Sequence, residues 1–155
     1  MQRNCVIIGI GNPDCGDDAA GRIVARQLNM KHAAGTRVVE HCGEAAGLVE
    51  CLSSARAAYI IDSSVTGQPP GAINRLNVAA KALPRGALGC STHGVGLAEA
   101  IELARALGRL PPRCVVYAIE GRRYEVGAAL SPEVAAAAEK VVMLIQDELA
   151  KCEAV

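Results

Sequence analysis

Aromatic side chains are nearly absent from this chain: its 155 residues include no Trp, no Phe and only three Tyr. Proteins that bind single-stranded nucleic acids use aromatic rings as stacking platforms for bases, so this composition argues against such a role. An excess of one charge is also absent, because 16 basic side chains balance 16 acidic ones. The balance argues against a nucleic acid or an anionic membrane as a partner attracted by bulk electrostatics.

Long apolar runs and paired cysteine motifs are missing as well. No apolar stretch approaches the length of a membrane span, and the N-terminus lacks a signal-peptide pattern, so we expect a cytoplasmic protein. Seven cysteines are present, but an odd count without a secretory signal argues against a disulfide framework. No C-x-x-C occurs, which argues against a structural zinc site. The length predicts a single domain over residues 1–155 with a sizeable core.

Predicted strands and helices alternate along the chain. Short apolar runs predict strands, and apolar residues at helical spacing predict helices. The expected strands cover residues 5–10, 37–42, 58–62, 72–77 and 113–120, and the expected helices cover 18–28, 45–52, 97–107 and 132–152. This alternation predicts a three-layer α/β fold, with a mostly parallel sheet covered by helices on both faces and the 72–77 strand at an edge.

The most informative stretch is VIIGIGNPDCGDDAAG, residues 6–21. An apolar strand runs into a Gly-rich turn, and the adjacent carboxylates Asp17 and Asp18 follow just before a helix. The glycines miss the G-x-G-x-x-G spacing of dinucleotide sites, and two carboxylates would repel a phosphate at the helix N-terminus. Two interpretations stay open: a metal or general-base site, or a simple helix cap, which this segment alone favours.

Further polar residues fall at the same predicted edge of the sheet. Asp62 ends the third strand, and His93 lies in a loop just before a helix. The carboxyl ends of parallel strands carry the sites of open α/β folds. With Asp17 and Asp18, this edge holds two or three carboxylates and one imidazole, and two carboxylates with a histidine form a ligand set suited to zinc, nickel, iron or manganese. His41 ends the second strand near this edge, where it could lie close to the site without taking part in it.

Four short motifs, each weak alone, follow one another along the chain. They are G-x-G-N with D-D at residues 9–21, a strand ending in Asp62 with P-G at 70–71, S-x-H-x-x-G-L at 91–97 with G-x-x-P at 108–111, and L-S-P-x-V at 130–134. In this order and spacing they resemble the hydrogenase maturation endopeptidases, which trim the C-terminal tail of the large subunit of nickel–iron hydrogenases. The resemblance covers residues 6–149.

The resemblance implies specific roles for the three edge residues. It implies that Asp18, Asp62 and His93 are both the catalytic and the metal-binding residues, contacting nickel that the hydrogenase large-subunit precursor already holds. It further implies a twisted five-stranded sheet, a monomer, no organic cofactor and no serine or cysteine nucleophile. The chemical step stays open between metal-activated water and a carboxylate acting as general base on water.

One departure from the family pattern follows the second strand. Many members carry an acidic residue and two glycines there, whereas this chain has Cys42-Gly43-Glu44. We therefore transfer no role to Glu44, and Cys42 could be either a soft ligand or a packing residue.

Two other classes of function remain open from the sequence. One is a non-proteolytic, metal-dependent binding protein or chaperone for a metalloenzyme precursor. The other is a small-molecule hydrolase or transferase, since a fold does not fix a function. An anion clamp at Arg122 and Arg123 would favour the latter, although a solvated loop suits this pair better.

Overall fold

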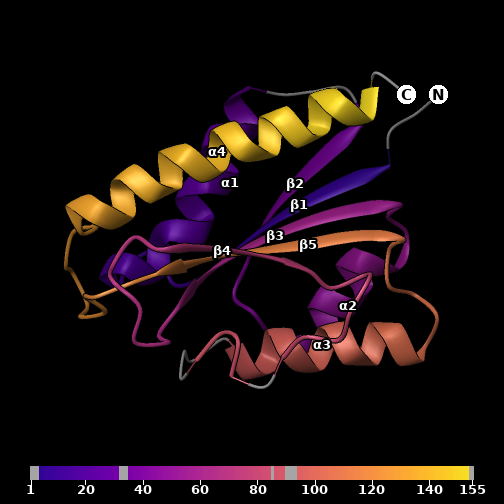
Figure 1. Cartoon of the computed structure of the whole chain (residues 1–155), viewed down its shortest axis with the longest axis horizontal. Helices are drawn as coiled ribbons and strands as arrows, with labels where there is room; N and C mark the ends of the chain where they lie inside the picture. Colours follow the sequence, from indigo (N-terminus) through magenta and orange to yellow (C-terminus); the bar gives the residue numbers. More distant parts are fainter. Residues whose placement is uncertain (1–3, 32–34, 85, 90–93, 154–155) are drawn as a thin grey trace.

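A computed structural model describes residues 4–31, 35–84, 86–89 and 94–153 of the chain. A five-stranded sheet lies between two layers of helices (Figure 1). The strands are β1 (Cys5–Ile10), β2 (Thr36–His41), β3 (Ala57–Ser64), β4 (Ile73–Asn77) and β5 (Arg113–Glu120). Their order is β2-β1-β3-β5-β4, and only β4, at one edge, runs antiparallel to its neighbour. The predicted fold class and the edge position of the fourth strand are confirmed.

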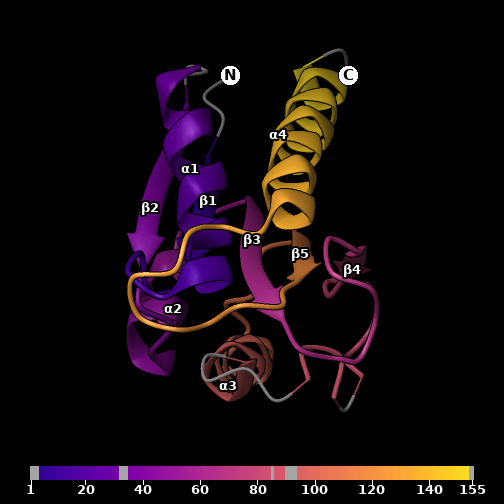
Figure 2. The same cartoon turned by 90° about the vertical axis from the view of Figure 1, so that its left-hand side faces the viewer.

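The helices cover both faces of the sheet (Figures 1 and 2). They are α1 (Ala20–Met30), α2 (Ala45–Ser53), α3 (Gly94–Ala106) and α4 (Pro132–Glu153). Helices α1 and α4 pack on one face with Tyr59 and Ile61, and α2 and α3 pack on the other with Ala58 and Ile60. Successive side chains of a strand point to opposite faces, and both faces are covered here, so β1 and residues 57–61 of β3 are apolar. No helix in the described part of the chain is long and apolar enough to cross a membrane.

One predicted helix begins with a different type of helix from the one expected. The helix expected over 18–28 begins as a 3-10 turn, η1 (Gly16–Ala19), and becomes α-helical only at Ala20. Gly16 has φ +58°, a left-handed conformation that favours glycine, and it turns the chain into η1. The third strand also runs to Ser64, two residues beyond its expected end, so Asp62 lies inside it. The other elements end within three residues of their predicted bounds.

The order of the strands creates a topological switch point between β1 and β3. The chain leaves β1 through α1 to reach β2 on one side, then returns through α2 to β3 on the other side of β1. The loops that follow β1 and β3 therefore diverge at their carboxyl ends. In open α/β folds, this switch point is where ligands bind.

Helix α1 approaches the sheet more closely than side chains would permit. A Cβ added at Gly21 would lie 2.4 Å from the carbonyl oxygen of Ile61 and 2.5 Å from that of Ile10. A Cβ added at Gly9 would lie 2.3 Å from the carbonyl oxygen of Gly21. The first turn of α1 thus rests directly on the backbones of β1 and β3, which places η1 over the switch point.

We expect Gly21→Ala to lower the free energy of unfolding. Alanine is favoured over glycine within a helix by about 1 kcal/mol, so a gain in stability would follow if the site had room. The two carbonyl oxygens leave no room, and overpacking of this kind costs about 1–3 kcal/mol. Urea unfolding at constant m value measures the change, with Asn29→Ala on the exposed side of α1 as control. Unchanged or increased stability of Gly21→Ala would contradict the close packing.

Candidate functional site

Asp18 lies on η1 and is buried at the switch point. The Asn12 N–H donates to its Oδ2 (2.9 Å), and the Ser63 hydroxyl donates to its Oδ1 (3.0 Å). A Cβ added at Gly11, where φ is +147°, would lie 1.8 Å from the Asp18 carbonyl oxygen. Only glycine fits this turn, which folds back over η1 and presents the Asn12 N–H to the carboxylate.

Asp62 is fully buried and shares a partner with Asp18. The Ser63 N–H donates to Asp62 Oδ1 (2.8 Å), while the Ser63 hydroxyl reaches Asp18. Register pairs Asp62 with Ala118, so Asp62 lies on the face of α2 and α3, whereas Ser63 lies on the face of α1. Ser63 thus links the two carboxylates across the strand: its hydroxyl donates to Asp18 on the α1 face, and its backbone N–H donates to Asp62, whose side chain lies on the opposite face.

The third predicted residue, His93, lies outside the described residues. The helix that follows it, α3, begins at the same edge of the sheet. A Cβ added at Gly96, in the first turn of α3, would lie 2.4 Å from the carbonyl oxygen of Gly43 in the loop after β2. Within the described ranges, no group of three His, Cys, Asp or Glu side chains could hold a metal ion. The convergence of His93 with the two carboxylates stays a prediction.

Asp17 does not share the role of its neighbour, and the predicted helix cap is wrong. The N-cap residue of η1 is Cys15 and that of α1 is Ala19, so neither aspartate occupies a capping position. The Asp17 carboxylate instead accepts hydrogen bonds from the N–H groups of Arg122 (2.8 Å), Arg123 (2.9 Å) and Ser131 (2.7 Å), and from the Ser131 hydroxyl (2.8 Å). Burial alone would raise its pKa, but these donors outweigh burial and lower the pKa below its ordinary value.

Glu120 is a second buried carboxylate that fixes a loop, and the sequence analysis missed it. It accepts hydrogen bonds from the Ser64 hydroxyl (3.2 Å), the Thr66 N–H (2.8 Å) and hydroxyl (2.7 Å), and the Gly67 N–H (3.2 Å). The signal available in the sequence was a glutamate at the end of the apolar run CVVYAIE. Glu120 holds the loop that follows β3 and Asp62.

His41 shapes the loop after β2. Its Nδ1 accepts a hydrogen bond from the Gly43 N–H (2.9 Å). Burial lowers its pKa, Arg22 adds to this effect and Glu44 opposes it, which favours the neutral ring that such an acceptor requires. The Glu44 carboxylate caps α2 by accepting hydrogen bonds from the N–H groups of Ala46 and Gly47. This structural contact agrees with our assigning Glu44 no site role from the family pattern.

Two other sequence candidates have surface positions. Cys42 is exposed, and no contact among the described residues joins it to Asp18 or Asp62. Arg122 and Arg123 have exposed side chains in an irregular loop, as the sequence favours.

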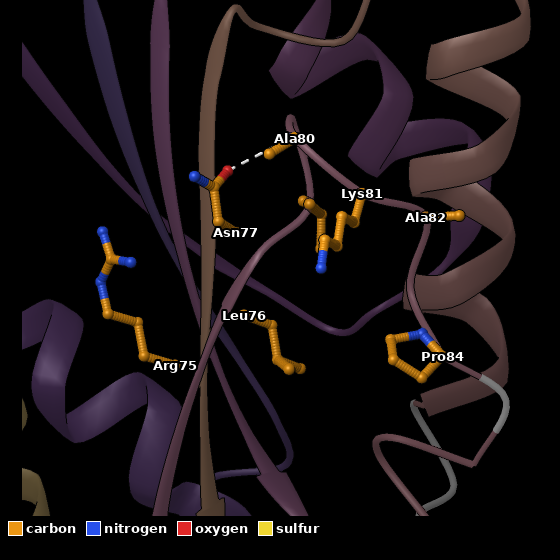
Figure 3. Close-up of a pocket in the computed structure, with 8 residues that line it drawn as sticks. Arg75, Leu76, Asn77, Ala80, Lys81, Ala82 and Pro84 are labelled. Atoms are coloured by element: carbon orange, nitrogen blue, oxygen red, sulfur yellow. Dashed lines mark hydrogen bonds between the residues drawn. The ribbon is translucent and has the colours of Figure 1, made fainter.

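A separate cavity of about 250 Å³ lies beside the edge strand β4 (Figure 3). The Asn77 side-chain oxygen accepts a hydrogen bond from the Ala80 N–H (3.3 Å) on its wall. No Asp, Glu, His or Cys is among the residues that line it, namely Arg75, Leu76, Asn77, Val78, Ala80, Lys81, Ala82 and Pro84. The cavity therefore lacks the carboxylate, imidazole and thiolate side chains that commonly bind metals.

Solved structures with this fold include several hydrogenase maturation endopeptidases. The HybD endopeptidase from E. coli has 20% sequence identity and a TM-score of 0.82, covering 98% of this chain and 94% of that chain. HybD from Thermococcus kodakarensis has 24% identity and a TM-score of 0.74, covering 95% and 98%. HycI from T. kodakarensis KOD1 has 22% identity and a TM-score of 0.70, covering 94% and 92%. These similarities show a shared fold.

The family itself is shown at the level of sequence. No curated protein matches the chain. A family model for the hydrogenase maturation proteases matches residues 23–148, most of the chain, including Asp62 and all of β3. Together with the fold and the motifs along the chain, this match shows that the protein belongs to the hydrogenase maturation protease family and is an endopeptidase of hydrogenase maturation.

Proposed function

We propose that this protein removes the C-terminal extension of the large-subunit precursor of a nickel–iron hydrogenase, and that it recognises nickel already bound in that precursor. Asp18, Asp62 and His93 would contact the metal. The observation that carries the proposal is the pairing of Asp18 and Asp62 through Ser63 at the β1–β3 switch point of a maturation-protease fold.

The donor set suits a metal that arrives with the substrate. Two carboxylates and an imidazole on an open edge leave coordination positions vacant, so they hold a free ion less firmly than a closed cysteine cage does. Thiolates of the precursor would dominate the binding of its own nickel, and ligands from this protein would fill the remaining positions. Binding would then depend on the metal, which limits cleavage to precursor that has received nickel.

The hydrogen bonds at the site orient the carboxylates before the substrate arrives. Ser63 donates to one oxygen of each carboxylate, and Asn12 donates to the other oxygen of Asp18. Partners of this kind fix ligand orientation and raise metal affinity. A carboxylate held at this edge is also placed to accept the proton of a water that attacks the scissile carbonyl.

Cleavage should depend on nickel in the precursor. We expect nickel-loaded large subunit to lose its C-terminal extension on incubation with the protein, and nickel-free subunit to remain intact. Mass spectrometry of the large subunit measures the outcome directly. Efficient cleavage of nickel-free precursor in the presence of a chelator would contradict recognition through the metal, although the protein would remain a protease.

Asp62→Asn and His93→Ala should each reduce processing by at least about 10²-fold, the scale of a lost acid–base group. Asparagine keeps the shape of the buried Asp62 side chain, so circular dichroism should show an intact fold. Asp147→Asn on the exposed side of α4 is the matched control and should process normally. Wild-type processing by His93→Ala would rule out its role in metal recognition.

A further inference from the structure

Residues 121–131 connect β5 to α4, and the first part of this connection, residues 121–127, crosses the edge of the sheet that faces the viewer in Figure 2. One part of the loop is tied to the turn before Asp18: the Asp17 N–H donates to the Arg123 carbonyl oxygen (2.7 Å), and the Gly127 N–H donates to the Asp14 carbonyl oxygen (2.8 Å). This 121–127 loop thus has a fixed position beside the first site carboxylate.

The other part of the 121–127 loop is tied to the end of β3, two residues beyond Asp62. The Gly121 N–H and the Tyr124 hydroxyl both donate to the Ser64 carbonyl oxygen, each at 3.1 Å. The loop is therefore hydrogen-bonded to both chain segments that carry the carboxylate pair. A substrate protein whose scissile peptide bond lies at Asp18 and Asp62 would therefore contact the 121–127 loop.

A buried charge anchors the loop. Asp17 is fully buried, and all four of its described acceptor contacts go to the chain between Arg122 and Ser131. Removing a carboxylate from water is costly unless hydrogen bonds replace the hydration. Here two of the four hydrogen bonds come from the 121–127 loop and two from Ser131 beyond it. A Cβ added at Gly16 would lie 2.5 Å from the Arg123 carbonyl oxygen, so η1 and the loop are also in close contact.

The outer side of the loop carries an exposed apolar side chain. Val126 is 83% exposed, and Val65, on the loop that Glu120 holds, is 39% exposed. Single exposed apolar residues are ordinary on protein surfaces. These two differ from that background because each sits on a loop fixed by a buried carboxylate at the edge that carries Asp18 and Asp62.

We propose that the 121–127 loop is a rigid docking element for the hydrogenase precursor protein, with Val126 packing on an apolar patch of that protein. Asp17 is a positioning residue that holds the loop in place. The inference rests on the proposed function and extends it, because it assigns a contact surface beyond the residues that meet the metal. A preformed loop loses little conformational entropy on binding, so the apolar contact contributes to affinity.

The test is the kinetics of cleavage of nickel-loaded precursor by Val126→Ser. Burying a valine side chain contributes a binding free energy that corresponds to roughly a tenfold change in affinity. KM should therefore rise by up to about tenfold while kcat stays at the wild-type value. Met143→Ser is the matched control: Met143 is 64% exposed and lies about 16 Å along α4 from its start. A wild-type KM, or a fall in kcat without a change in KM, would overturn the docking role.

Asp17→Asn tests the positioning role separately. An amide nitrogen in place of one carboxylate oxygen would face backbone N–H donors, so the loop should detach and trypsin should cut faster after Arg122 and Arg123. KM should rise as in Val126→Ser, and adding Val126→Ser to Asp17→Asn should raise it no further. Faster trypsin cleavage with an unchanged KM would overturn the docking role of the loop.

The outcomes separate the two proposals. If wild-type protein cuts the nickel-loaded precursor and Val126→Ser matches it in KM, the docking inference is wrong and the proposed function stands. If wild-type protein leaves this precursor uncut, the proposed function fails, and the docking role fails with it.

Discussion

Direct contact between the backbone of α1 and the backbones of β1 and β3 determines the geometry of the whole carboxyl edge. Gly9 and Gly21 have no side chains to separate the helix from the strands, so the helix begins immediately over the switch point. The short turn η1 then has little freedom, because its own Asp18 carbonyl packs against Gly11. Asp18 can reach Ser63 of β3 only from this position.

Neighbouring carboxylates at this edge have different tasks because their partners differ. Asp17 and Glu120 accept hydrogen bonds from the backbone N–H groups and hydroxyls of loop residues, so their charges organise the chain. Asp18 and Asp62 are both hydrogen-bonded to Ser63 and lie at the switch point between β1 and β3. The first pair holds loops in place at this edge, and Asp18 of the second pair joins η1 to β3.

The sequence predicts those features that depend on local pattern. Apolar runs locate β1, β3 and β5, and the residues that end them identify the Asp18–Asp62 edge, because parallel strands end on a common side. Local pattern misassigns Asp17 as a cap, since a cap is the ordinary local use of aspartate before a helix. Its real partners lie 105 to 114 residues away along the chain, and only the topology brings them near. Glu120 is missed for the same reason, because its partners lie 53 to 56 residues away.

The long-range hydrogen bonds of Asp17 also determine when this edge is completed as the chain folds. Contacts between residues so far apart require closure of a very long loop, whose entropic cost delays them relative to local structure. The segment that carries Asp18 acquires its final surroundings only after β5 has joined the sheet and α4 has begun at Pro132. A chain that has folded only through β3 contains both carboxylates and Ser63 but lacks the contacts between residues 121–131 and the segment before Asp18. Assembly of the edge is thus coupled to completion of the C-terminal part of the fold.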